Sequence, residues 1–196
     1  MKTKLVTVGI TALATILGAA MAQGPGGGKG APKAPGMSLS TPDFEDGGII
    51  PEKYTQQAGP TAPNPKLVIG NVPPGTQTFV LLFHDPDGTP SKGAGDVTHW
   101  LAFNIPGDKR EIAGGLPTDA KLPDGTVQAK NQRGNPGYMG PGNGAINPYH
   151  HYTFELWALD TKLDLGPDAA RDDVMKAMAG HAIGKAVLEG RFKRTQ

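Results

Sequence analysis

The chain of 196 residues contains no cysteine, and after its first residues it has no apolar run long enough to span a membrane. The lack of thiols excludes disulfides, thiol catalysis, thiolate metal sites and lipid attachment through an N-terminal cysteine. Stability must therefore come from a hydrophobic core, which a chain of this length can build in a single domain.

An excess of charge of either sign is also absent. The chain has 19 basic and 18 acidic residues. Residues 1–22 contain two lysines and no acid, so their removal leaves 17 basic and 18 acidic residues and a net charge of −1. Non-specific nucleic-acid binding depends on a basic surface, so this balance argues against a nucleic-acid partner.

The N-terminus has the three parts of a secretory signal peptide. Lys2 and Lys4 form a basic start, Leu5–Leu17 is an apolar run that is short for a membrane span, and Ala20–Ala22 offers small residues for cleavage. An uncleaved anchor is the alternative. We predict a signal peptide over residues 1–22 and a periplasmic or secreted mature protein with no integral membrane association.

A change in composition separates this leader from the rest of the chain. Gln23–Gly36 consists almost entirely of Gly, Pro, Ala and Lys and has no large apolar side chain. Such a segment cannot offset the entropy cost of ordering, so we predict a flexible linker over residues 23–37. A single globular domain is then expected over residues 38–196.

Short apolar segments punctuated by Gly and Pro indicate a mainly β domain. The chain has 29 Gly and 19 Pro, and this punctuation is typical of all-β proteins. Strands are predicted at Lys66–Asn71, Gln77–Asp85, Val97–Ile105 and Tyr149–Asp160, with weaker candidates near Met37–Leu39, Ile49–Lys53 and Thr126–Ala129.

The C-terminal part differs from this pattern. Val174, Met175 and Met178 stand at helical spacing behind an acidic start, which predicts a peripheral helix over Asp168–Met178. His181–Leu188 is expected to continue as a further turn or short helix after Gly180.

Polar residues stand at one end of three predicted strands whose inner faces are otherwise apolar. They are Asp85 on the first, His99 on the second, and His150 with Tyr152 on the third. Strand side chains alternate with period two, so each should point the same way as its apolar companions. These companions are Phe79, Leu81 and Phe83 for the first strand, Leu101, Phe103 and Ile105 for the second, and Phe154, Leu156 and Ala158 for the third.

A carboxylate and two imidazoles on an inner face are costly unless they pair or meet a ligand. We therefore expect Asp85, His99, His150 and Tyr152 to form a small polar pocket suited to phosphate or sulfate. A hydrogen-bonded sheet end without a ligand is the plain alternative. His84 and His151 alternate to the outer faces and are expected to face solvent.

Two enzymatic alternatives use the same residues. Two His and one Asp could hold zinc or iron, although widely spaced His residues support this weakly. A hydrolase needs a nucleophile beside a base, and the chain has no Gly-x-Ser-x-Gly motif. We predict no catalytic residue, no metal and no cofactor.

Several motifs occur in order along the chain, principally Asp85-Pro86-Asp87, His99-Trp100, Gly137-Tyr138-x-Gly140-Pro141 and His150-x-Tyr152. In these motifs the chain resembles the phosphatidylethanolamine-binding protein family, in particular its bacterial Raf kinase inhibitor-like branch. Each motif is weak alone, but their order along the chain is specific. Supporting matches extend the similarity from about Ser38 to Arg194: Phe44-x-Asp46-Gly47, Ile50-Pro51-x-x-Tyr54, Asn104-Ile105-Pro106, Met178-x-Gly180-His181, Gly190 and Arg194.

The resemblance implies a sandwich of two antiparallel sheets with peripheral helices, and a pocket that accepts phosphate, acetate or a phosphoryl head group. Carried over by motif position, the residues that line the pocket would be Asp85, His99, Gly140, His150 and Tyr152, with Pro86 and Asp87 shaping its rim.

The expected function is therefore an exported binding module for a small anion or phosphorylated head group. It would act on an envelope protein partner, for example by inhibiting a protease. The alternatives are a phosphoester hydrolase or metal-dependent enzyme that uses His99 and His150, and a structural protein whose pocket is vestigial. Homodimer formation is left open.

Overall fold

The computed structural model describes residues 35–90, 95–142 and 148–194. The predicted signal peptide (1–22) lies outside the described residues, as does the predicted linker (23–37) apart from its last three residues. Both therefore remain predictions. No helix in the described part of the chain is long and apolar enough to cross a membrane.

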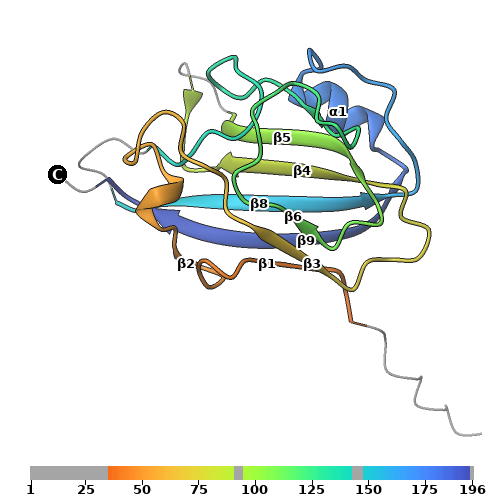
Figure 1. The fold of residues 1–196 in the computed structure, drawn as a ribbon, viewed down its shortest axis with the longest axis horizontal. Helices are drawn as coiled ribbons and strands as arrows, with labels where there is room; N and C mark the ends of the chain where they lie inside the picture. The colour runs from red at the N-terminus through yellow and green to blue at the C-terminus, as the bar shows by residue number, and fades with distance from the viewer. Residues whose placement is uncertain (1–34, 91–94, 143–147, 195–196) are drawn as a thin grey trace, which may run out of the picture. The chain divides into compact units, whose positions relative to one another are not determined.

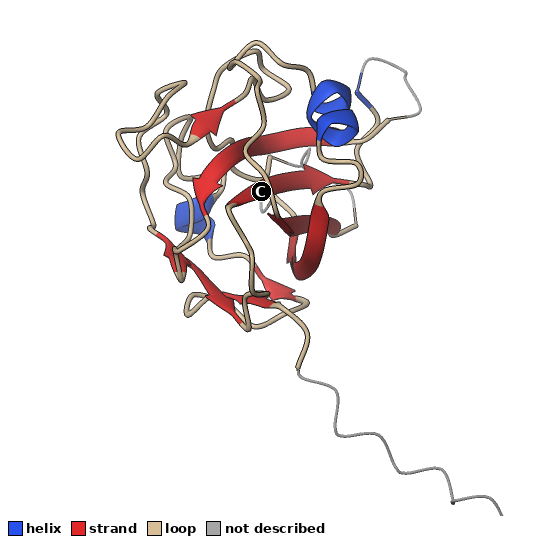
Figure 2. Ribbon diagram, turned by 90° about the vertical axis from the view of Figure 1, so that its right-hand side faces the viewer, coloured by secondary structure: helices blue, strands red, loops and turns tan. Residues whose placement is uncertain are grey.

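Two sheets form the framework (Figures 1 and 2). The smaller sheet has the order β1 (Ser38–Ser40), β3 (Leu67–Gly70), β6 (Glu111–Ile112). The larger sheet has the order β2 (Gly48–Ile49), β9 (Ala182–Phe192), β8 (His150–Leu159), β4 (Thr78–Asp85), β5 (Val97–Pro106), β7 (Val127–Gln128). Neighbouring strands pair antiparallel except β2 and β9, which are parallel. The fold is thus the expected mainly β, two-sheet sandwich.

Two hydrophobic clusters cover the two faces of the larger sheet. The first fills the space between the sheets, where Leu67 and Ile69 of β3 pack in one cluster with Phe79 and Leu81 of β4. The second lies on the outer face, where Val80 and Leu82 of β4 pack in one cluster with Val174 of α1 (Arg171–Ala177). Because both faces are covered, every β4 residue except His84 is buried.

The C-terminal helix was correctly expected, but the segment after it was not. Residues 182–192 form β9, the longest strand, instead of a second helical turn. Their burial alternates, with Ala186, Leu188 and Phe192 inward and Val187 exposed between them. This period of two, together with two interior glycines, favours a strand over a helix.

A β-bulge corrects the expected orientation of β5. Phe83 pairs with Trp100 and His84 with Thr98, so His99 is an extra residue on β5. Trp100 belongs to the cluster between the sheets, whereas Leu101 belongs to the outer cluster. Strict alternation predicts that His99 shares a face with Leu101 and Phe103. Instead, those two residues face the outer cluster, and the bulge turns His99 to the inner face.

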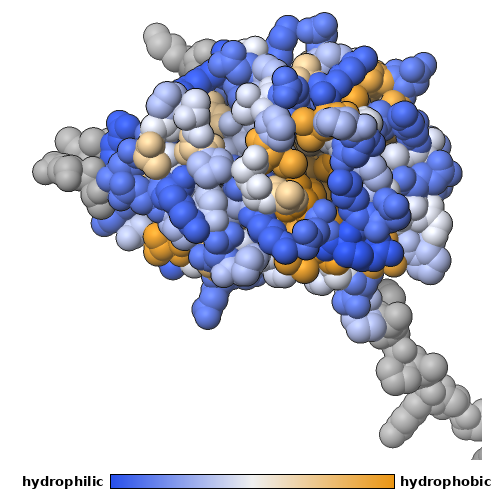
Figure 3. All heavy atoms as spheres, viewed as in Figure 1, coloured by the Kyte–Doolittle hydropathy of each residue, from blue (hydrophilic) through white to orange (hydrophobic). Residues whose placement is uncertain are grey.

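A short helical element contributes a side chain to the space between the two sheets. The 3₁₀ helix η1 (Glu52–Tyr54) follows β2 and places Tyr54 in the cluster between the sheets. Figure 3 shows a mostly hydrophilic face with apolar side chains gathered near its middle.

Candidate functional site

A polar pocket of about 400 Å³ opens where β4 ends and β5 and β8 begin. It brings together the four residues that alternation placed at the strand ends: Asp85, His99, His150 and Tyr152. The remaining lining residues come mainly from loops: Gln56, Gly88, Val97, Gln132, Arg133, Met139 and Gly142.

The carboxylate of Asp85 is buried and holds two partners. His150 Nδ1 lies 2.8 Å from its Oδ2 atom, and the backbone N–H of Asp87 donates to its Oδ1 atom at 2.9 Å. A carboxylate accepts hydrogen bonds, so this contact assigns the Nδ1 hydrogen of His150. Asp85 therefore sets both the orientation and the tautomer of His150.

His99 is buried at the base of the pocket. Its Nδ1 atom lies 2.8 Å from the carbonyl oxygen of Met139, which therefore receives the Nδ1 hydrogen. Burial lowers the pKa of His99 below its ordinary value of 6.5, against the opposing effects of the Met139 and Gly140 carbonyls and of Asp85. The ring is thus neutral at pH 7, with its lone pair on Nε2.

Aromatic rings fix the position of this imidazole. The edge of His99 meets the Tyr152 ring at 5.3 Å between centroids, and Phe83 lies 5.4 Å away on the other strand. Tyr152 lies in turn 6.4 Å from the His150 ring. Tyr152 therefore lies close to both imidazoles of the pocket.

Three residues carried over by resemblance are absent from the residues that line the pocket: Gly140, expected in the lining, and Pro86 and Asp87, expected at the rim. Gly140 packs against the Tyr54–Thr55 backbone, and its carbonyl accepts a hydrogen bond from Gln56 Nε2 at 2.8 Å. Asp87 accepts from the backbone N–H and from Nδ1 of His151, at 2.7 and 2.8 Å. Pro86 lines a separate depression beside Arg171.

The loop side chains of the pocket, above all Arg133, were not among the predicted site residues. Arg133 is exposed and donates to Oε1 of Gln56, close to the mouth of the pocket. The available signal was its position, because Arg133 is the single basic residue of the long loop Asn131–Pro148.

The outer-face histidine His84 was expected to face solvent but is largely buried. Its Nδ1 atom lies 2.5 Å from Asp96 Oδ2, and Asp96 also pairs with Arg171 of α1. This ion-pair cluster lies on the α1 side of the sheet and contributes no residue to the pocket.

The lining of the pocket bears on the two enzymatic alternatives, metal-dependent and nucleophilic chemistry. No group of three or more His, Asp or Glu residues in the described part of the chain is arranged to hold a metal ion. Among the described lining residues none is Ser, Thr, Cys or Lys, so the groups there that could act as nucleophiles are Asp85, the two imidazoles and the Tyr152 phenol.

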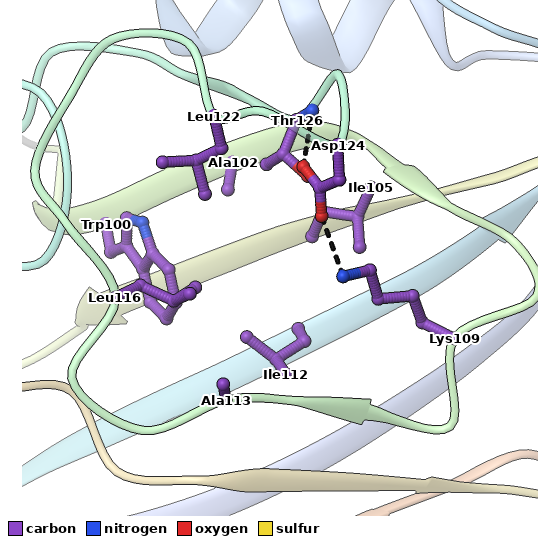
Figure 4. Close-up of a pocket in the computed structure, with 10 residues that line it drawn as sticks. All are labelled: Trp100, Ala102, Ile105, Lys109, Ile112, Ala113, Leu116, Leu122, Asp124 and Thr126. Carbon is purple, nitrogen blue, oxygen red and sulfur yellow. Dashed lines mark hydrogen bonds and ion pairs between the residues drawn. The ribbon is translucent and has the colours of Figure 1, made fainter.

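A second, mostly apolar cavity of about 50 Å³ lies between β5 and β6 (Figure 4). Trp100, Ile105, Ile112 and Leu116 surround it, and the ion pair between Lys109 and Asp124, at 2.7 Å, crosses one side. None of the residues predicted for the anion site lines this cavity.

Comparison with known proteins assigns the chain to a family. A family model described as phosphatidylethanolamine-binding protein matches residues 40–193. A UPF0098 protein from Methanothermobacter thermautotrophicus is 42% identical over 158 residues, which cover 81% of this chain and 99% of that protein. The chain belongs to the phosphatidylethanolamine-binding protein family.

Other members of the phosphatidylethanolamine-binding protein family agree with this assignment. A homologue from Chlamydia trachomatis superposes with a TM-score of 0.71 at 30% identity, covering 81% of this chain and 98% of that chain. YbcL from E. coli superposes with a TM-score of 0.72 at 24% identity and the same coverage, which supports the shared fold. A Mycobacterium tuberculosis protein whose name describes it as a lipoprotein, LppC, is 32% identical over 83% of this chain and 75% of its own length.

Proposed function

We propose that the protein is a non-enzymatic binding module whose polar pocket takes a phosphoryl group or similar small anion. The observation that carries the proposal is the fixed pair of imidazoles, His150 held by Asp85 and His99 held by the Met139 carbonyl. Both Nδ1 hydrogens are committed to protein acceptors, so ligand contact falls to the Nε2 atoms.

The two Nε2 atoms suit a partly protonated phosphoryl group. A neutral imidazole can accept a hydrogen bond from a phosphoryl O–H, and a protonated one donates to a phosphoryl oxygen. Arg133 at the mouth adds a permanent positive charge with donors suited to phosphate. Asp85, the single carboxylate of the described lining, has both oxygens in hydrogen bonds, to His150 and to the Asp87 N–H, so it is poorly placed as a nucleophile, which favours binding over hydrolysis.

Export is a second part of the proposal. The family match begins at residue 40, so the segment before β1 precedes the shared domain. That segment has the charge and apolar pattern of a signal peptide. The lipoprotein name of the M. tuberculosis relative is compatible with export, whereas the Methanothermobacter relative has no equivalent leader. Modulation of an envelope protein partner remains a prediction.

The proposal is tested by titrating inorganic phosphate into the protein while imidazole resonances are recorded. We expect the resonances of His99 and His150 to shift together and those of His181 to stay fixed, because His181 pairs with Asp160 away from the pocket. Unfolding provides a second readout, since phosphate at 100 times its dissociation constant adds about 2.7 kcal/mol of stability. Unchanged His99 and His150 resonances at millimolar phosphate would overturn the proposal.

A further inference from the structure

A second cavity shares a wall with the polar pocket. This groove of about 470 Å³ has Arg133 and Met139 in common with the pocket. Four prolines dominate its walls, and we call it the proline-lined groove. Its other lining residues are Thr61, Ala62, Asn64, Gly115, Leu116, Thr118, Asn131, Asn135 and Tyr138, and the prolines are Pro60, Pro63, Pro117 and Pro136.

Prolines and one asparagine hold the walls of the groove in place. Proline fixes its own backbone angle, which limits the movement of the walls. Asn64 ties the two sides together, because its Oδ1 atom accepts from the backbone N–H of Leu116 and its Nδ2 atom donates to the Ala113 carbonyl, both at 2.8 Å. A preformed cavity of this size is within the usual range for small-molecule sites.

Arg133 is unlike the other cations that line cavities. Lys109 pairs with Asp124, and Arg171 pairs with Asp96. Arg133 has no ion pair among the described residues and contacts only the neutral amide of Gln56. Its charge is therefore available to an anion at the junction of the pocket and the groove.

The groove contributes no other charge. Arg133 is the single charged side chain among the described residues that line it, and its remaining exposed polar groups include the hydroxyls of Thr61 and Thr118 and the amide of Asn135. A cationic group placed there would find no carboxylate, whereas hydroxyl groups would find neutral donors and acceptors.

We infer that the ligand is a phosphoester of an uncharged polyhydroxy alcohol, such as a sugar phosphate. The phosphoryl group occupies the polar pocket, Arg133 contacts its oxygens from the shared wall, and the alcohol lies in the proline-lined groove. This inference rests on the proposed phosphoryl-binding function. It specifies which ester is preferred, and it disfavours a head group that carries an ammonium.

Isothermal titration calorimetry on the full chain tests the preference for a sugar phosphate separately from the proposed binding of a phosphoryl group. The probes are inorganic phosphate, glucose-6-phosphate and phosphorylethanolamine. We expect glucose-6-phosphate to bind about tenfold more tightly than either of the other probes. A tenfold gain is what about one additional hydrogen bond, between the sugar hydroxyls and the groove, would contribute. We expect Arg133→Gln to weaken inorganic phosphate and the sugar phosphate alike, by about tenfold.

A groove-filling variant identifies where the sugar lies. Thr61 is exposed, so Thr61→Trp should fold normally, and Thr118→Trp fills the same groove from another wall. Either variant should lose the glucose-6-phosphate gain and keep the affinity for inorganic phosphate. Ala179→Trp, at an exposed position outside the groove, is the matched control and should keep both.

Each outcome decides one proposal. If inorganic phosphate binds but phosphorylethanolamine binds as tightly as the sugar phosphate, or the tryptophan variants keep the gain, this inference is wrong and the phosphoryl pocket stands. If none of the three probes binds, the proposed function fails and the inference fails with it.

Discussion

The Nδ1 atom of His150 lies 2.8 Å from Oδ2 of Asp85, although 65 positions separate the two residues in the chain. The antiparallel pairing of β4 with β8 makes this contact possible, because it brings the last residue of β4 close to the first residues of β8. The contact converts two distant polar residues into one oriented unit at the mouth of the pocket.

Replacement of this carboxylate should weaken phosphate binding. In Asp85→Asn the amide oxygen can still accept from the Asp87 backbone N–H, but the charge that holds the His150 Nδ1 hydrogen is lost. The imidazole is then no longer held for contact with phosphate, and loss of one charge-assisted hydrogen bond to the ligand, about 1.5–3 kcal/mol, should lower phosphate affinity by roughly tenfold or more in calorimetry.

Asp160→Asn is the matched control for this substitution. Asp160 pairs with Nδ1 of His181 at the same distance of 2.8 Å, but on an exposed surface outside the pocket. It should leave phosphate affinity unchanged. An Asp85→Asn protein that binds phosphate as well as the wild type would show that Asp85 does not orient the site.

Buried His99 should make stability depend on pH just below neutrality. Its pKa in the folded protein lies below the ordinary value of 6.5, so the unfolded chain binds the proton more readily. The free energy of unfolding therefore falls as pH drops from 6.5 toward the folded pKa, with a slope of at most about 1.4 kcal/mol per pH unit.

Urea denaturation of the wild type and of His99→Gln across this window measures the effect. We expect the variant to lose the slope that His99 contributes, whereas His181→Gln, at an exposed position, should retain it. Equal slopes in the wild type and His99→Gln would contradict the assignment of a depressed pKa to this residue.

The convergence of three strand ends was predictable because two of them obey simple alternation. Phe79, Leu81 and Phe83 lead to Asp85 on the inner face of β4, and Tyr152 begins the inner face of β8. Period-two alternation is a local property, so the sequence alone displays it.

His99 lines the pocket as predicted, but the alternation of faces predicted for β5 was wrong. Alternation grouped His99 with Leu101 and Phe103, which in fact pack on the outer face. The bulge that turns His99 inward depends on the pairing of β5 with β4, a non-local relationship that no pattern within β5 reveals.

The loop residues of the pocket were not predictable for a similar reason. Gln56 and Arg133 come together because Gln56 follows η1 and Arg133 lies in a loop tied to β5 through the hydrogen bond from Gln132 N–H to the Thr98 carbonyl, at 2.8 Å. Neither segment has a periodic pattern, and their meeting depends on tertiary contacts.

Gly140 should act through packing and not through contact with the anion. A Cβ atom at this position would lie 2.5 Å from the Tyr54 carbonyl oxygen and 2.9 Å from Thr55 Cα, both backbone atoms that cannot move aside cheaply. Overpacking of this kind costs about 1–3 kcal/mol, so we expect Gly140→Ala to destabilise the fold by that amount in urea denaturation.

The control for Gly140 is Gly166→Ala, since a Cβ at Gly166 would meet nothing within 4 Å. It should leave stability nearly unchanged. A Gly140→Ala protein of normal stability with greatly reduced phosphate affinity would instead support direct contact between Gly140 and the ligand.

The ion-pair cluster under α1 should stabilise the fold without affecting the pocket. Asp96 joins Arg171 to His84 and is mostly buried. Burial would raise the pKa of Asp96, but its contacts with Arg171 and His84 outweigh this and lower it below 3.8. The pair therefore stabilises the protein above pH 3.8 and loses this contribution as pH falls through the lower folded pKa.

Asp96→Asn should lower the free energy of unfolding by about 2 kcal/mol at pH 7, a value between those typical of exposed and of fully buried ion pairs. The difference from the wild type should shrink in denaturation experiments at pH values below 3.8, where the wild-type carboxylate also becomes protonated. Asp168→Asn, in the exposed pair with Lys130, serves as the control and should change stability little. The affinity for phosphate should be unaffected, because Asp96 does not line the pocket. A loss of phosphate affinity in Asp96→Asn would instead show that α1 and the pocket are coupled through the end of β4.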